Sequence, residues 1–219
     1  LNLLLTTAGF AFAVAGLGTV IGFFGACTLR FTPSDRLRSL SLFILPSAAI
    51  PPHIHAMAWA ALLGWLNRFL RQSGLSALSE QGFGISVWVQ TMSLLPFALG
   101  ILFLTLNGLP GEQLEASRVV SPDKRTLLRV LLPLVTPGLS ASFSFLFLVS
   151  LLDYSVPSLF QLNLYALGIF SEYSVRYDAA QAILMTLPLL FVSLPVCWLL
   201  QRSLRRLPLT PPVEGREIR

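Results

Sequence analysis

The sequence predicts an all-α protein that crosses a membrane several times. Of its 219 residues, 54% are hydrophobic and only 11% are charged, whereas an average soluble domain is about a quarter charged. The apolar residues form long continuous stretches, and crossing the hydrocarbon core takes about 20 such residues in a helix. None of the stretches shows the alternation of a membrane barrel strand. Because backbone groups in lipid must be satisfied within their own element, we expect helices.

Five stretches are long enough to span, and together they predict a polytopic membrane helix bundle. They are, approximately, Leu3–Thr28, Leu40–Leu66, Ile85–Leu106, Val130–Leu152 and Ala179–Leu200. We expect one domain over residues 1–206 and a polar, proline-rich cytoplasmic tail over 207–219. The chain opens at Leu1 inside an apolar run and without Met. A sixth span upstream would place both ends of the bundle inside.

The charges predict the orientation. Twelve of the fifteen lysines and arginines follow the first span, separate the third from the fourth, or follow the fifth. Positive residues concentrate in cytoplasmic loops. We therefore expect the N-terminus of this chain outside, the C-terminus in the cytoplasm and membrane lipid around the spans. Since topology explains the net charge of +5, it gives no reason to expect a nucleic-acid partner.

A polar segment between the third and fourth spans, Gly111–Leu139, predicts a cytoplasmic helix–turn–helix. A first short helix would have an apolar edge of Leu114 and Val119. Ser121 and Pro122 then suit the start of a second helix, because Ser caps free amide groups and Pro fits the first helical position. We expect this second helix to run directly into the fourth span. The plainer alternative is an ordinary basic loop with a well-capped helix.

The string Glu115-Ala116-Ser117, followed by Leu132-Pro133, resembles the EAA loop of ABC-transporter permeases, the membrane components of binding-protein-dependent type I importers. The family glycine is missing: Ser121 stands at its spacing, and the remaining distance to Leu132 is one residue short. In that family the loop is the docking element for a separate ATPase. The resemblance implies an ATPase-coupling role for Glu112, Leu114, Glu115, Ala116, Ser117, Arg118, Val119, Ser121, Pro122, Leu132 and Pro133.

Other stretches are similar to one subgroup of these permeases. Leu45-Pro46 to Pro51-Pro52, LLDYSVPSLF, NLYALGIF and YDAAQA look like segments of ferric iron permeases, so that the likeness extends from about Leu3 to Gln201. It implies transport of ferric iron. Polyamines, thiamine, phosphonates and oxyanions remain alternative substrates.

The resemblance also implies partners. The single lysine, Lys124, follows no glycine-rich loop, so no phosphate-binding P-loop is present in the sequence. We therefore expect no cofactor on this chain and no enzymatic activity of its own, with ATP and Mg on a cytoplasmic ABC ATPase. A second permease copy or half, and a periplasmic or lipoprotein substrate-binding protein, would complete an importer in a bacterial inner membrane.

A few polar residues in or near spans are candidates for the substrate path. Asp153 and Tyr154 end the fourth span, and a carboxylate near a span is a functional candidate. The plainer interpretation is an interfacial acid that reaches water. His53 and His55 follow Pro51, but residues two apart do not share a face of a regular helix. They are more simply core or cavity histidines, and we expect no metal site.

Two other classes of protein remain to be weighed. An ion-coupled secondary carrier would need buried ionisable residues and usually a repeated half. A membrane-embedded enzyme would need a nucleophile or metal motif, such as His-Glu-x-x-His or Gly-x-Ser-x-Gly. The sequence contains neither of these motifs.

Overall fold

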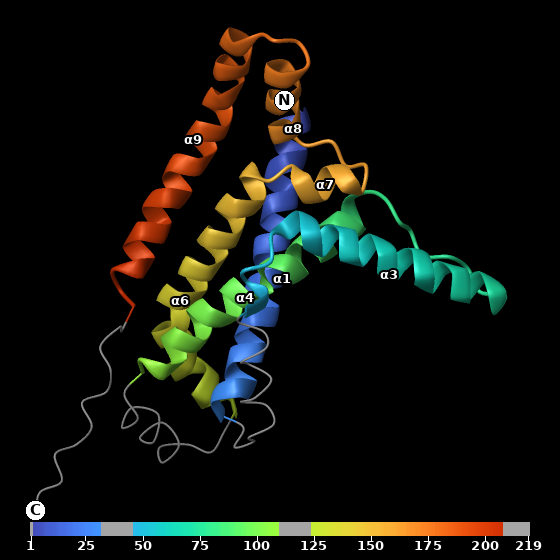
Figure 1. Cartoon of the computed structure of the whole chain (residues 1–219). Helices are drawn as coiled ribbons and strands as arrows, with labels where there is room; N and C mark the ends of the chain where they lie inside the picture. Colours follow the sequence, from blue (N-terminus) through green and yellow to red (C-terminus); the bar gives the residue numbers. More distant parts are fainter. Residues whose placement is uncertain (1, 32–45, 110–123, 208–219) are drawn as a thin grey trace, which may run out of the picture.

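The computed structural model describes residues 2–31, 46–109 and 124–207, without the side chains of 31 and 124–131. In this part of the chain every regular element is a helix (Figure 1). Four helices are long and apolar enough to cross a membrane, which indicates a multi-pass membrane protein. They are α1 (Asn2–Phe31), α4 (Phe83–Asn107), α6 (Lys124–Leu152) and α9 (Ala179–Leu204).

The predicted second span is wrong as a single membrane helix. Within its described part, a turn over residues 48–50 and an extended Pro51 precede α3 (Pro52–Gln72), which is not among the four candidate spans. Pro52 occupies the first turn of α3, where its fixed φ fits and its missing N–H is not needed. Asn67, Arg68 and Arg71 make the end of α3 polar, and Figure 1 shows the helix pointing away from the bundle.

The contacts between the four long helices define their relative directions. Their contacts place α1 and α4 in the same direction, since Phe10 meets Phe83 and Gly22 meets Ala98. Helix α6 runs the opposite way, because Phe12 meets Phe143 near the other end of that helix. Helix α9 returns beside α6 (Figure 1). The C-terminal ends of α1, α4 and α9 and the N-terminal end of α6 therefore lie at the same end of the bundle.

Glycines let α1 approach its neighbours closely. A Cβ on Gly22 would lie 2.8 Å from the Ala98 Cβ, and one on Gly25 would lie 2.5 Å from the Leu99 side chain. A Cβ on Gly18 would collide with Leu146 of α6. Small residues four apart allow such contact between membrane helices, where van der Waals packing rather than the hydrophobic effect holds the pair. Gly18 and Gly22 form this Gly-x-x-x-Gly pattern.

A continuous core fills the space beside these contacts. It contains Phe10 and Val14 of α1, Leu94 of α4, and Leu146 and Leu151 of α6, all buried. One interhelical polar contact crosses it, at 3.4 Å between the Thr19 and Ser142 hydroxyls. A second cluster, towards the other end, includes Ala26, Leu102, Leu106 and Val135. Helices α1, α4 and α6 thus form one packed unit.

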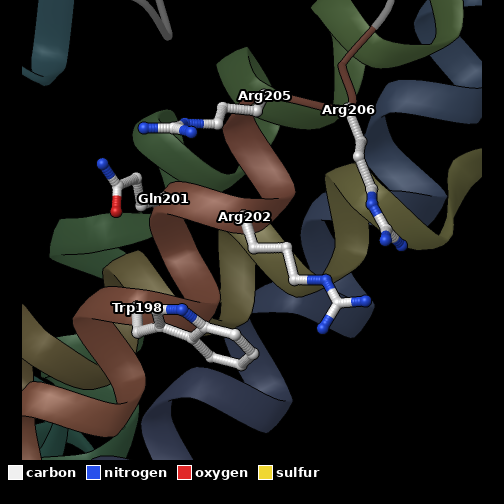
Figure 2. Close-up of a pocket in the computed structure, with 5 residues that line it drawn as sticks. All are labelled: Trp198, Gln201, Arg202, Arg205 and Arg206. Atoms are coloured by element: carbon white, nitrogen blue, oxygen red, sulfur yellow. The ribbon is translucent and has the colours of Figure 1, made fainter.

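Helix α9 is different because most of its surface is free of the bundle. Only 6% of its most apolar window is buried, compared with 44% or more in the other three candidate spans. It ends in a cluster of cationic side chains beside Trp198 (Figure 2). A helix that is apolar on its exposed sides is stable in lipid or against another apolar surface.

Short helices cover the opposite end of the bundle. Helix α7 (Ser155–Leu159) packs with α3 and α4, and the Gly82 N–H donates to the Phe160 carbonyl at 2.8 Å. Helix α8 (Tyr165–Ser174) lies beside the N-terminal part of α9, and its first N–H donates to the Thr7 hydroxyl at 2.8 Å. Helices α7 and α8 are therefore folded over this end of the bundle.

A larger residue at Gly22 should destabilise the bundle. We expect Gly22→Val to lower the free energy of unfolding by about 1–3 kcal/mol, as overpacking typically does. The space is closed by the Ala98 backbone as well as its Cβ, at 3.2 Å and 2.8 Å. Thermal unfolding of the purified chain in detergent measures this.

Gly16 supplies the matched control on the same helix. A Cβ there meets nothing within 4 Å, so Gly16→Val should leave stability nearly unchanged. Equal losses at the two positions would show that close α1–α4 contact is not the cause.

Candidate functional site

The predicted coupling residues divide between described and undescribed parts of the chain. Residues 112–122, and with them every candidate from Glu112 to Pro122, lie outside the described residues. Leu132 and Pro133 lie in α6, and both are exposed. Helix α6 is continuous from Lys124 to Leu152, with Pro133 and Pro137 inside it. The predicted entry of a helix into the fourth span without a break is therefore present from Lys124 onward.

Local contacts stabilise α6 where its prolines remove backbone donors. The Thr136 hydroxyl donates to the Leu132 carbonyl at 2.7 Å. At Gly138 the helix comes so close to α4 that a Cβ would collide with Thr105. Pro137 leaves the Pro133 carbonyl without its i+4 N–H donor, so the Thr136 bond lies beside the lost bond and does not replace it. Close packing against α4 supports the helix there, and α6 is continuous through both prolines.

Asp153 lies at the far end of this rod, and its two oxygens have different environments. Oδ1 accepts from the Ser155 N–H at 2.8 Å and from the Ser155 hydroxyl at 2.6 Å. Oδ2 is buried and has no hydrogen-bond partner among the described residues. The residue as a whole is half-buried, so the expectation of an interfacial acid stays a prediction. Asp153 joins the end of α6 to the start of α7.

Tyr154 forms an aromatic wall with Phe170 at the end of the bundle where α6 finishes. Its ring stacks on Phe170 of α8, with centroids 4.9 Å apart. Both rings line an open groove of about 530 Å³ between the end of α6, α8 and α9. The groove is mostly apolar, with Thr186 and Ser193 among its few polar side chains. Tyr154 and Phe170 thus pack against each other at this end of the bundle.

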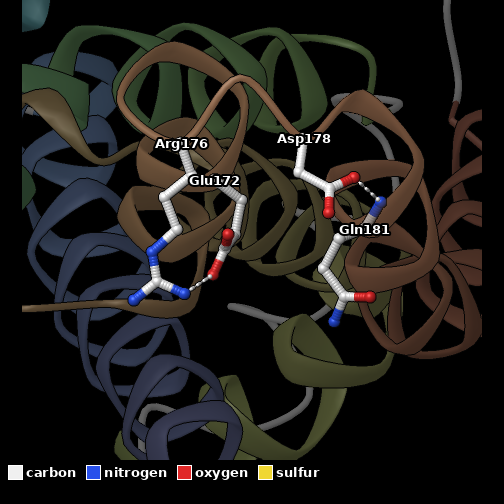
Figure 3. Close-up of polar contacts among 4 residues, drawn as sticks. All are labelled: Glu172, Arg176, Asp178 and Gln181. Carbon is white, nitrogen blue, oxygen red and sulfur yellow. Dashed lines mark hydrogen bonds and ion pairs between the residues drawn. The ribbon is translucent and has the colours of Figure 1, made fainter.

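Two polar contacts stabilise the turn from α8 into α9. The Asp178 carboxylate accepts from the Gln181 N–H at 2.9 Å and caps α9, while Arg176 pairs with Glu172 at 2.8 Å (Figure 3). The cap satisfies one of the free amides at the start of a helix. The ion pair is exposed on its arginine side and contributes little, since such pairs are worth about 0–1 kcal/mol.

His53 and His55 do not form a metal site with other described residues. Both lie in the regular first turns of α3, so Pro51 precedes the helix rather than distorting it between them. His53 is exposed, and the His55 Nε2 lies 3.4 Å from the Ser47 carbonyl. No group of three or more metal-ligating side chains occurs in the described ranges. The two histidines therefore face different surroundings, as their spacing predicts.

The sequence reasoning missed a set of buried polar side chains. Gln90 is completely buried, and neither its Oε1 nor its Nε2 has a hydrogen-bond partner in the described structure. Three hydroxyls share this condition: those of Thr91, Ser144 and Ser150. Gln90 shares a helical face with Val87 and Leu94, which belong to the core between α1, α4 and α6. A glutamine inside the apolar run ISVWVQTMSLL was the signal in the sequence.

Such orphaned groups are costly unless something else satisfies them. A buried polar group without a partner costs about 1–3 kcal/mol, and native proteins usually satisfy it with ordered water. The interior of the bundle can therefore offer hydrogen bonds to water at Gln90. Among the described residues that are buried as a whole none is charged; Asp153, which also has an orphaned oxygen, is half-buried.

No protein-family model matches the chain, and no curated protein matches it in sequence.

Removing the Asp153 acceptor should loosen the link between α6 and α7. We expect Asp153→Ala to lower the free energy of unfolding by about 1 kcal/mol, typical of a lost helix-start acceptor. Asp153→Asn keeps Oδ1 and should lose less. Thermal unfolding in detergent measures both variants, and an equal loss in the two would show that the charge matters rather than the acceptor.

Proposed function

We propose that this chain is the transmembrane permease subunit of an ATP-driven ABC importer. The observation that carries the proposal is the continuity of α6. One helix joins the polar segment that resembles an EAA loop to Asp153 and the aromatic wall at the opposite end. Movement imposed on its N-terminal end would reach the outer end without a flexible linker.

The helix ends that carry most of the arginines lie on one side of the bundle, which supports docking of the ATPase at that side. Lys124 begins α6 at the end where α1, α4 and α9 finish, and Arg30, Arg202, Arg205 and Arg206 lie at that end too. Under the positive-inside rule this end faces the cytoplasm. The resembling loop would then face a cytoplasmic ATPase, which would bind ATP and Mg in place of this chain.

The buried polar side chains of the bundle suit a substrate pathway better than a tight substrate-binding site. Gln90 and the buried hydroxyls offer hydrogen bonds without charge, and Asp153 contributes one shielded oxygen near the outer end. A separate substrate-binding protein would provide capture and selectivity. Ferric iron is the proposed substrate from the subgroup resemblance; polyamine, thiamine, phosphonate and oxyanion remain alternatives within the same class.

A bundle of four candidate spans is small for a complete transport path. A second permease copy or half would supply the other wall, and the bare surface of α9 leaves apolar area for lipid or for that partner. The alternative in another class is an ion-coupled carrier, and nucleotide dependence separates the two.

Reversing the charge of Glu115 should weaken the complex with the ATPase. The partner to test is a cytoplasmic ABC ATPase co-expressed with this chain and co-purified from detergent-solubilised membranes. We expect Glu115→Lys to reduce association by about tenfold or more, because unpairing one partner of an interfacial charge pair costs about 2–5 kcal/mol. ATP-dependent uptake of labelled ferric iron into proteoliposomes should fall in parallel.

Glu214→Lys is the matched control, because it makes the same charge reversal in the tail. It should leave assembly and uptake unchanged. Unchanged assembly and uptake with Glu115→Lys would contradict the coupling role. Uptake that persists without nucleotide but collapses with the ion gradient would instead indicate a secondary carrier.

A further inference from the structure

The end of α9 carries a stripe of one aromatic ring and two guanidinium groups. Trp198 and Arg202 are four residues apart in α9, so they lie on one face, about 6 Å apart along the axis. Arg206 lies in the turn that follows the end of the helix at Leu204. Figure 2 shows Arg202 and Arg206 extending to the same side of the helix, while Arg205 and Gln201 extend to the other. Together these residues line a hollow of about 250 Å³.

Within the described ranges, no acidic side chain neutralises these guanidinium groups. The Arg202 Cζ lies 5.3 Å from the centre of the Trp198 ring, a cation–π contact that restrains its position. No acidic side chain pairs with Arg202, Arg205 or Arg206 within the described ranges, where the recorded ion pair is Arg176–Glu172. Like charges one turn apart repel each other on a helix. An anion placed between them would remove this repulsion.

The exposed apolar face of α9 that precedes Trp198 indicates that the anion is the headgroup of a lipid. Leu187, Phe191, Leu194 and Trp198 follow at spacings of three and four residues, and all are exposed. The stripe therefore passes from hydrocarbon-compatible side chains, through a tryptophan of the kind enriched at membrane interfaces, to two arginines. This is the order in which a phospholipid presents acyl chain, glycerol region and phosphate.

We propose that Trp198, Arg202 and Arg206 form a binding site for the phosphate of an anionic phospholipid in the leaflet at the C-terminal end of α9. The arginine forks would hold the phosphate oxygens, which guanidinium groups match in geometry. The acyl chains would lie along Phe191 and Leu187. The site does not depend on the proposed transport activity, because it requires only that α9 spans a bilayer.

A simpler role for these arginines is to stabilise the C-terminal end of the α9 dipole. That role concerns charge at the helix end alone. It would not distinguish an anionic lipid from a zwitterionic one. Lipid selectivity is therefore the property that separates the two.

The experiment compares lipid retention by the full chain in native mass spectrometry. The detergent-solubilised protein is titrated with phosphatidylglycerol and phosphatidylcholine, and the ratio of the two adducts is measured. We expect at least tenfold preference for phosphatidylglycerol. Arg202→Gln/Arg206→Gln should reduce it by about tenfold to 30-fold, given the attraction of each arginine to an anionic surface.

Arg68→Gln/Arg71→Gln is the matched control, since it removes two charges from the end of α3. It should change the ratio by less than about twofold. Trp198→Leu keeps both charges and should reduce the preference by about threefold through loss of the ring. Circular dichroism checks that each variant keeps its helical content, and the tryptophan variant still tests the site if the double variant does not fold.

Three results would overturn the proposal. Equal lipid ratios for the α9 and α3 double variants would show that the α9 arginines are not the site. Displacement of the lipid by inorganic phosphate at equal concentration would identify a soluble anion as the ligand. Loss of ATPase association with unchanged lipid ratios would identify the stripe as a protein contact.

Discussion

The structure depends on how closely α1 can approach α4 and α6. Within lipid there is no hydrophobic gain in pressing one apolar helix against another, so contact at short range has to hold them. Gly18, Gly22 and Gly25 supply this on α1, and Gly138 does the same where α6 passes Thr105. The bundle is therefore organised around the backbone of α1. The first helix of the described chain is also its central support.

This support explains the difference between the rigid and the exposed parts. Helix α6 packs on both α1 and α4, so it is held along its length despite two prolines. Helix α9 touches mainly α6 and α8, and its surface stays apolar and open. The same fold thus contains α6, which is packed along its length, and α9, which is surrounded by lipid or by another chain.

The long apolar runs predicted four of the elements well because length and hydropathy depend only on local sequence. The expected Ala179–Leu200 helix, for example, is α9, which continues to Leu204. The second span failed because its apolar content did not reveal that Pro51 and Pro52 start a new helix. The Gly18 and Gly22 spacing and the buried Gln90 were visible in the sequence. Which helix each would face depended on packing, which a single sequence does not show.

The candidate site shows the same division. The spacing of His53 and His55 correctly excluded a shared face, because helical geometry alone decides it. The environment of Asp153 was not predictable, because it depends on Ser155 folding back as the start of α7. The coupling segment up to Pro122 stays a prediction, since it lies outside the described residues.

The polar interior and the shielded oxygen of Asp153 bear on the transport function that we propose. Each orphaned group costs stability, so a bundle selected for stability alone would replace Gln90 with an apolar residue of similar size. Keeping uncharged donors and acceptors in the core favours solutes that exchange hydrogen bonds as they pass and does not trap a charged one. This is the property expected of a conduit whose selectivity lies in a separate binding protein. In the proposed importer, direction would come from movement of α6 driven by the partner ATPase.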